Sequence, residues 1–247
     1  MRTLIDWLNS KSIETGSKIV LAADVSGPYE SRVGRAASLV SRLKDRIVAV
    51  KVNLHLLLPF GVLGLKELVN VCVDADLPLI ADLKLNDIGA TNREATETLF
   101  SNGFDVLIAT PFVGSEAAIG EVINMTKQMH KGLLLLVYMS HRGAKEGYGL
   151  KLGGEPLYVR FAKKTRQWGA DGAVVSSKSP SIIREVRSIL GDQQLIFSPG
   201  VGVQGGDARK ALAAGSDYVI VGRTIVEAKD PLRTLEELNR DLGPRRT

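Results

Sequence analysis

Short apolar runs rich in β-branched residues recur along the chain, separated by stretches in which apolar residues return at helical spacing. The eight runs cover residues 18–25, 47–54, 78–85, 105–112, 132–140, 172–177, 194–200 and 218–223. Apolar runs of this length are typical of strands buried on both faces. The amphipathic stretches long enough for helices include residues 30–45, 92–103 and 114–129. This alternation of strands and helices predicts a parallel sheet.

Eight strand-helix units predict an α/β fold, a single (β/α)8 TIM barrel, because eight parallel strands can close on themselves. A doubly wound open sheet stays open as an alternative, since periodicity gives the number of strands without their order. A short N-terminal helix is expected over residues 3–12, with Leu4, Trp7 and Leu8 on one face. We expect it to plug or flank the barrel and to take no part in the chemistry.

Composition is consistent with one globular domain. The 247 residues are 45% hydrophobic and 24% charged, and no linker or low-complexity stretch divides residues 1–247. No window approaches 18 uninterrupted apolar residues, and Asp6 and Asn9 interrupt the stretch where a signal peptide needs an apolar segment. We therefore expect a cytoplasmic protein without a membrane partner.

The charge distribution and the cysteine content argue against a nucleic-acid-binding protein, a disulfide-bonded protein and a thiolate-metal protein. Lys and Arg number 32 against 27 Asp and Glu, and these charges are dispersed. The densest basic pair, Arg245 and Arg246, lies in the C-terminal tail and not along an aromatic-interleaved groove, so no nucleic-acid partner is expected. Cys72 is the only cysteine, which excludes an intrachain disulfide and a thiolate metal cluster and suggests a buried helix residue.

Charged residues stand near the carboxyl ends of the predicted strands, the barrel face where catalytic residues gather. They are Asp24, Lys51, Asp82, Lys84 and Arg223. Asp82 and Lys84 are two residues apart in one strand, so their side chains point to the same side. The three histidines, His55, His130 and His141, lack metal-ligand spacing, and we expect no metal and no proton-transfer role for them.

A structural ion pair is the plainer interpretation of Asp82 and Lys84, because buried charges must pair. Two neighbours favour a catalytic site instead. Lys51 enters from the adjacent strand, and Asp87 follows three residues after Lys84. Two lysines and two carboxylates in one pocket favour each other's charged forms, which suits proton transfer and charge stabilisation.

A glycine-rich segment, SPGVGVQGGD, follows the seventh strand, and IVGRT ends the eighth. Gly200, Gly202 and Gly205 satisfy the dinucleotide-binding pattern G-x-G-x-x-G. That motif normally follows the first strand of its fold, and an acidic residue follows the next strand. In this chain the pattern follows the seventh strand, and the residue after the next strand is Arg223. Glycine loops after strands seven and eight of a barrel bind phosphate, and Gln204 can add a donor. A flexible turn with a surface arginine is the alternative.

The segments LAADV, AVKVN, ADLKLNDIGATN, MSHRGA, SPGVGVQGGD and VIVGRT occur in order between about residues 18 and 226. With these residues the chain resembles the orotidine 5′-monophosphate decarboxylase family, and its archaeal-type members most. The resemblance implies a carboxy-lyase that converts orotidine 5′-monophosphate (OMP) to uridine 5′-monophosphate (UMP) and CO2 in pyrimidine biosynthesis, without metal or cofactor.

The resemblance also implies roles for the charged residues. Asp24 and Lys51 would hold the ribose hydroxyl nearest the phosphate, and Lys51 would also anchor the charged array. Asp82 would lie against the substrate carboxylate. Lys84 would protonate the carbon that loses CO2.

The resemblance also implies roles for three residues after the third strand, two of which act beyond their own barrel. The resemblance implies a homodimer in which Asp87 and Thr91 reach the other ribose hydroxyl of the partner's site, while Ile88 lines the pyrimidine pocket. The position of Asp87 fits this expectation. Asp82 and Lys84 are at even-numbered positions that point into the barrel, whereas Asp87 is at an odd-numbered position beyond the end of the strand and can point away from it.

The remaining implied contacts hold the base and the phosphate. Ser140 would hydrogen-bond the base, and Gln204 would bridge base and phosphate. Arg223 and the backbone of Gly222 would clamp the phosphate, and Pro199 would begin the loop that closes over it.

Two other functions stay open from the sequence. A Mg2+-dependent sugar-phosphate decarboxylase or synthase of the same superfamily shares D-x-K-x-x-D, but carries glutamate where this chain has Lys51, and a lysine repels Mg2+. A non-catalytic phosphate or nucleotide sensor on a barrel would need the glycine loop but not the four charges.

Overall fold

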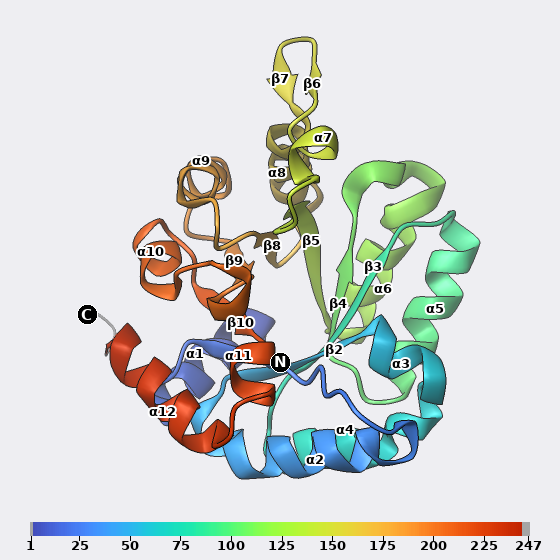
Figure 1. Ribbon diagram of the computed structural model, residues 1–247. Coiled ribbons are helices and arrows are strands. Elements are labelled where there is room, and N and C mark those ends of the chain that lie inside the picture. The colour runs from blue at the N-terminus through green and yellow to red at the C-terminus, as the bar shows by residue number, and fades with distance from the viewer. Residues whose placement is uncertain (1, 244–247) are drawn as a thin grey trace.

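A computed structural model describes residues 2–243 and shows a closed barrel of eight parallel strands (Figure 1). The strands are β1 (Ile19–Ala22), β2 (Ala49–Asn53), β3 (Leu79–Leu85), β4 (Val106–Ala109), β5 (Gly132–Tyr138), β8 (Gly172–Val175), β9 (Leu195–Pro199) and β10 (Tyr218–Val221). Their order around the barrel is β1-β10-β9-β8-β5-β4-β3-β2, so sequential barrel strands are neighbours throughout. The predicted (β/α)8 barrel is confirmed and the open sheet is wrong. Arg245 and Arg246 lie outside the described residues.

Helices cover the outside of the barrel. They include α2 (Arg32–Leu43), α4 (Lys66–Asp74), α5 (Gly89–Ser101), α6 (Gly120–Met129), α8 (Leu157–Trp168), α9 (Pro180–Leu190), α10 (Ala208–Ala213) and α12 (Pro231–Leu242). Short turns of helix join them: η1 (Tyr29–Ser31), η2 (Lys44–Arg46), α3 (Leu54–Phe60), η3 (Leu63–Leu65), η4 (Pro111–Val113), η5 (Ser115–Ile119), η6 (Gly202–Gln204) and α11 (Arg223–Val226). Cys72 is buried on α4, as expected, and burial raises the pKa of its thiol to about 12.

Apolar side chains pack in two layers, one inside the barrel and one between the barrel and its helices. Val20 and Ala22 of β1 belong to the inner layer, whereas Ile19 and Leu21 belong to the outer one. Successive side chains of a strand point to opposite faces. Because both faces are buried here, the strands appear in the sequence as continuous apolar runs.

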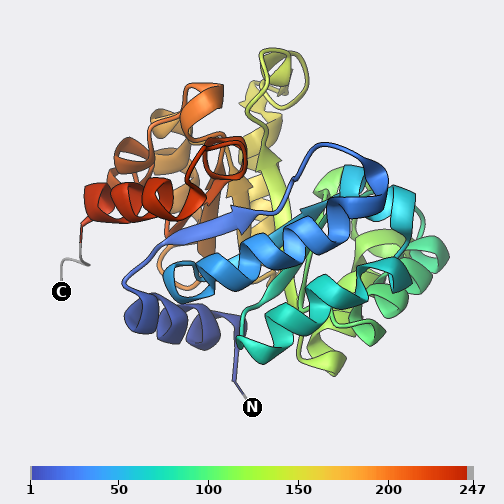
Figure 2. The ribbon, with the colours of Figure 1, turned by 60° about the horizontal axis from the view of Figure 1, so that its bottom comes forward.

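The first helix closes the amino-terminal end of the barrel (Figure 2). Helix α1 (Leu4–Thr15) begins with a capping box formed by Thr3 and Asp6. Leu4 and Leu8 join the inner apolar layer, and Leu4 lies so close to Gly132 of β5 that a Cβ there would meet its Cδ2 at 2.6 Å. The helix therefore plugs the barrel, and it runs three residues beyond the predicted range.

The segment after β5 forms a short helix and a hairpin that the sequence pattern does not predict. Helix α7 (Ala144–Gly147) is followed by an antiparallel hairpin of β6 (Lys151–Leu152) and β7 (Glu155–Pro156), which projects from the carboxyl-terminal face (Figure 1). Two-residue strands are too short to leave a periodic signal.

Among residues 2–243, no single helix is long and apolar enough to cross a bilayer. One pair, Leu54–Phe60 with Leu63–Asp74, meets the criteria of length and composition together, but it is bent by 108°.

Candidate active site

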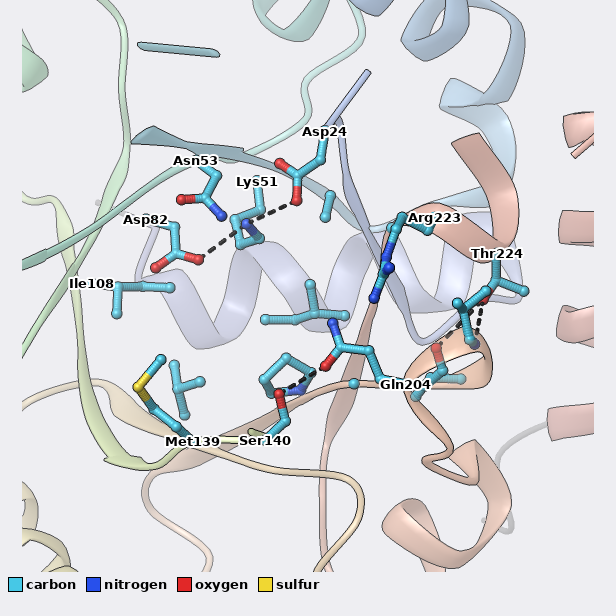
Figure 3. Close-up of a pocket in the computed structure, with 18 of the residues that line it drawn as sticks. Asp24, Lys51, Asn53, Asp82, Ile108, Met139, Ser140, Gln204, Arg223 and Thr224 are labelled. Carbon is cyan, nitrogen blue, oxygen red and sulfur yellow. Dashed lines mark hydrogen bonds and ion pairs between the residues drawn. The ribbon is translucent and has the colours of Figure 1, made fainter. Parts of the chain in front are cut away.

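A cavity of about 240 Å³ opens at the carboxyl ends of the barrel strands (Figure 3). Its polar lining consists of Asp24, Lys51, Asn53, Asp82, Lys84, Ser140, Gln204, Arg223 and Thr224. Its apolar floor consists of Ala22, Ile108, Leu136, Met139, Val174 and Ile220. The glycine-rich segment contributes Pro199, Gly200, Val201 and Val203, and Gly222 completes the wall beside Arg223. The cavity therefore lies on the barrel face that carries catalytic residues in this fold.

Four charged side chains form a row along one wall of the cavity. Lys51 Nζ lies 3.8 Å from Asp24 Oδ2 and 3.0 Å from Asp82 Oδ2. Lys84 Nζ lies 2.8 Å from Asp82 Oδ1. Lys51 and Asp82 are 4% and 8% exposed, so the centre of the row is shielded from water. Negative and positive groups alternate along the row from β1 to β3.

The central carboxylate keeps its charge despite its burial. Burial alone would raise the pKa of Asp82, but the ammonium groups of Lys51 and Lys84 outweigh it and lower that pKa below its ordinary value. Asp82 is therefore an anion at neutral pH and holds both lysines at the cavity wall.

Strand β3 is distorted where it delivers Lys84. Lys84 has a left-handed backbone with φ of +52°, and the pairing of β3 with β4 shifts register between Ala81 and Leu85. A lysine in this conformation costs about 1 to 2 kcal/mol. The sequence predicted that Asp82 and Lys84 would share one side, and the structure reaches that contact through a bulge instead of plain alternation.

The glycine loop, residues 200–206, forms the opposite wall. Gly200, Gly202 and Gly205 have φ of +97°, +73° and +86°, a region that other residues rarely adopt. The N–H of Gly206 donates to Gly200 O at 2.9 Å, and the N–H of Gly202 donates to Gly206 O at 3.0 Å. These two bonds fold the loop into a compact turn.

Two contacts fasten the glycine loop to its neighbours. Ser140 Oγ donates to Gln204 Oε1 at 2.8 Å, which ties the loop to the segment after β5 (Figure 3). The N–H of Val203 donates to Thr224 Oγ1 at 3.3 Å, which ties it to α11. Arg223 begins α11 and lies across the cavity from Asp82 (Figure 3). A guanidinium beside a glycine loop suits the binding of a phosphate group.

Three predicted residues do not line the cavity of their own chain. Asp87 and Ile88 are exposed on the segment between β3 and α5, and Thr91 is exposed in the first turn of α5. The Asp87 carboxylate accepts the N–H of Ile88 at 2.7 Å. Within the chain, the second carboxylate of the charged row is therefore Asp24 and not Asp87.

Sequence reasoning missed several cavity residues, among them Asn53, Thr224 and Met139. Asn53 ends β2, two residues after Lys51, and its Oδ1 accepts the N–H of Leu54 at 2.7 Å to cap α3. Its position two residues after Lys51 could have predicted that its side chain lies on the same face of β2. Thr224 and Met139 stand beside residues that were predicted, but nothing in their type marks them as cavity residues.

The barrel, the charged row and the glycine loop define a TIM-barrel enzyme with a site for a phosphorylated substrate. The chain belongs to the family described as "Orotidine 5'-phosphate decarboxylase / HUMPS family", which matches residues 17–238. It is 31% identical over 230 residues to orotidine 5′-phosphate decarboxylase of Methanosarcina acetivorans, covering 93% of this chain and 96% of that protein. The predicted resemblance to this family is confirmed.

Solved structures agree with this assignment. Orotidine 5′-monophosphate decarboxylase of Methanocaldococcus jannaschii, complexed with inhibitor BMP, superposes with a TM-score of 0.79 at 28% identity, over 92% of this chain and 99% of that chain. UMP synthase of Leishmania donovani superposes with a TM-score of 0.86 at 23% identity, a likeness that shows the fold alone. The present chain is covered to 98% but spans 56% of that synthase.

Proposed function

We propose that the protein is an orotidine 5′-phosphate decarboxylase that converts OMP to UMP and CO2 in pyrimidine biosynthesis. The observation that carries the proposal is Lys51 at the centre of the charged row, 3.0 Å from Asp82 and facing the glycine loop across one cavity. Such a cavity holds a phosphate at one wall and a reacting carboxylate at the other.

The phosphate end of the substrate is bound by the glycine loop. Arg223 and the backbone of Gly222 clamp the phosphate oxygens, and Pro199 begins the loop that covers them. Ser140 and Gln204 hydrogen-bond the pyrimidine, and Gln204 also reaches the phosphate. The phosphate does not react, so its binding energy can order the cavity around the reacting end.

The charged row carries the reaction. Asp24 and Lys51 hold a ribose hydroxyl. Asp82 lies against the substrate carboxylate and repels it, and this repulsion is relieved when the carboxylate becomes neutral CO2. The bond to the carboxyl carbon breaks, CO2 leaves, and the electron pair stays on the ring carbon. The Lys84 ammonium stabilises that charge and transfers a proton to the carbon. The resulting neutral amine then regains a proton from water.

The Mg2+-dependent sugar-phosphate decarboxylase or synthase is disfavoured by the same observation. Lys51 places an ammonium beside Asp82, where a bound Mg2+ would be repelled. Among residues 2–243, no group of three or more His, Cys, Asp or Glu side chains is arranged to hold a metal ion. The reaction we propose needs no metal and no cofactor, because a fixed cation already faces the developing charge.

An ultraviolet assay of OMP consumption in excess EDTA tests substrate and metal independence together. We expect full activity in EDTA and no gain from added Mg2+. Activity that vanishes on chelation and returns with Mg2+ would favour the metal-dependent alternative. A protein that binds the nucleotide without consuming it would favour the sensor.

We also propose a homodimer whose active sites are shared, with Asp87, Ile88 and Thr91 entering the partner's cavity. All three are exposed in the single chain. Exposed apolar side chains stand on the segments that follow the adjacent strands β2, β3 and β4, namely Leu58, Leu63, Ile88 and Phe112. Apolar side chains gathered on neighbouring loops are typical of a protein interface.

The remaining assignments stay predictions with simple tests. Cell fractionation tests the cytoplasmic location and the lack of a membrane partner. A binding assay with RNA and DNA tests the lack of a nucleic-acid partner. A single cooperative unfolding transition would support one domain over residues 1–247.

A further inference from the structure

A buried hydroxyl stands just behind the glycine loop without a hydrogen-bond partner. Ser177 follows β8 and is 1% exposed. Its Oγ contacts no solvent and has no partner among residues 2–243. A buried hydroxyl without a partner is unfavourable, since folding removes its hydrogen bonds to water and puts nothing in their place.

A carbonyl acceptor of the glycine loop, Gly200 O, lies near this hydroxyl. A Cβ built on Gly206 would lie 2.0 Å from Ser177 Oγ and 2.4 Å from Gly200 O, so both oxygens sit against the same point of the glycine loop. Gly200 O already accepts the N–H of Gly206 at 2.9 Å. A carbonyl oxygen has a second lone pair, so Gly200 O can accept another bond.

The same serine lies beside the contact that ties the loop across the cavity. A Cβ built on Gly200 would lie 3.1 Å from Ser140 Cβ, 3.3 Å from Gln204 Oε1 and 3.4 Å from Ser177 Oγ. The backbone N–H of Ser177 donates to Pro199 O at 2.9 Å, at the start of the loop. Both the main chain and the side chain of Ser177 therefore lie next to the glycine loop.

We propose that Ser177 is a positioning residue for the phosphate site. When a nucleotide 5′-phosphate draws the glycine loop inward, Ser177 Oγ donates to Gly200 O and gains the bond that it lacks in the free protein. The new bond holds the loop on the phosphate and contributes to affinity only when the phosphate is present. This inference rests on the proposed function, which supplies the phosphorylated ligand.

Ser177→Ala tests the inference, with Ser176→Ala as the matched control. Ser176 is also 1% exposed, but its Oγ accepts the N–H of Lys178 at 3.2 Å. The control variant loses an existing bond, so its melting temperature should fall while its affinity ratio for UMP over uridine stays that of wild type. Ser177→Ala loses no bond in the free protein, so its melting temperature should hold or rise.

The readout is the affinity for UMP and for uridine, measured by calorimetry on the intact protein. Ser177→Ala should weaken UMP binding about fivefold to tenfold, the effect of one net hydrogen bond, and leave uridine binding unchanged. Unchanged UMP affinity overturns the inference. So does an equal loss for UMP and uridine together with a lowered melting temperature, which would make Ser177 an ordinary core residue.

Wild-type measurements separate this inference from the proposed function. A wild-type protein that binds UMP more tightly than uridine but does not consume OMP would overturn the decarboxylase and leave the role of Ser177 standing. A wild-type protein that binds both equally would overturn the phosphate site, and the role of Ser177 with it.

Discussion

Asp82→Asn removes one negative charge from between two lysines and changes the side-chain volume little. Asp82 lies 3.0 Å from Lys51 Nζ and 2.8 Å from Lys84 Nζ. The variant leaves Lys51, which is 4% exposed, with Asp24 at 3.8 Å as its one remaining counter-ion among residues 2–243. An uncompensated buried charge is a strong source of instability.

The size of the effect follows from these distances and exposures. At an effective dielectric constant of about 20, two unit charges about 3 Å apart attract by about 5 to 6 kcal/mol. Desolvation offsets part of that attraction, and breaking a buried pair costs about 3 to 5 kcal/mol in net terms. The Lys84 side chain is 29% exposed and can turn toward water, so we expect the lower end, a loss of about 3 kcal/mol.

Urea unfolding measures this loss, with Asp241→Asn as the control. Asp241 pairs with Arg209 at 3.2 Å, but the two side chains are 66% and 67% exposed. The same substitution there should cost less than about 1 kcal/mol. Equal losses in the two variants would refute the reasoning that burial makes the Asp82 pairs strong.

The difference in free energy of unfolding between wild type and Asp82→Asn should disappear at acid pH. The pKa of Asp82 is lowered in the folded protein, because Lys51 and Lys84 outweigh the effect of burial. The charged carboxylate therefore contributes stability that is fully present above the unfolded pKa of about 3.9 and is lost as the pH falls through the lower folded value. A stability difference that grows toward acid pH would contradict this sign.

Three further variants test the site. Lys84→Ala should abolish turnover while UMP still binds, because the developing negative charge loses its cation and proton donor; near-normal turnover would remove Lys84 from this role. Arg223→Ala should lower kcat/KM on OMP far more than on the nucleoside, and an equal fold-loss would place Arg223 elsewhere. Mixed Lys84→Ala and Asp87→Ala chains should regain about a quarter of wild-type activity, since about half the dimers are hybrids with one intact site. Mixtures that exchange subunits but stay inactive would place both residues in one chain's site.

The sequence by itself determined the number of barrel strands and three of the four residues of the charged row. Both faces of each strand are buried, so the strands appear as apolar runs, and the rare charges within them stand out. Lys51, Asp82 and Lys84 could be predicted on this basis, because a charge near a strand end is costly unless it is paired or used. The glycine loop could be predicted because positive φ values require glycine at several of its positions.

Only the tertiary structure decided the order of the strands, the plug formed by α1 and the identity of the second carboxylate. Asp24 and Asp87 are both acidic residues near strand ends, and the odd position of Asp87 in its segment does not by itself show that Asp24 is the one that reaches Lys51. The left-handed backbone of Lys84 and the unpartnered hydroxyl of Ser177 depend on neighbours that are distant in the sequence. Periodicity reports which side of its own strand a residue occupies, but contacts between strands depend on register and closure, which the packing of the whole barrel sets.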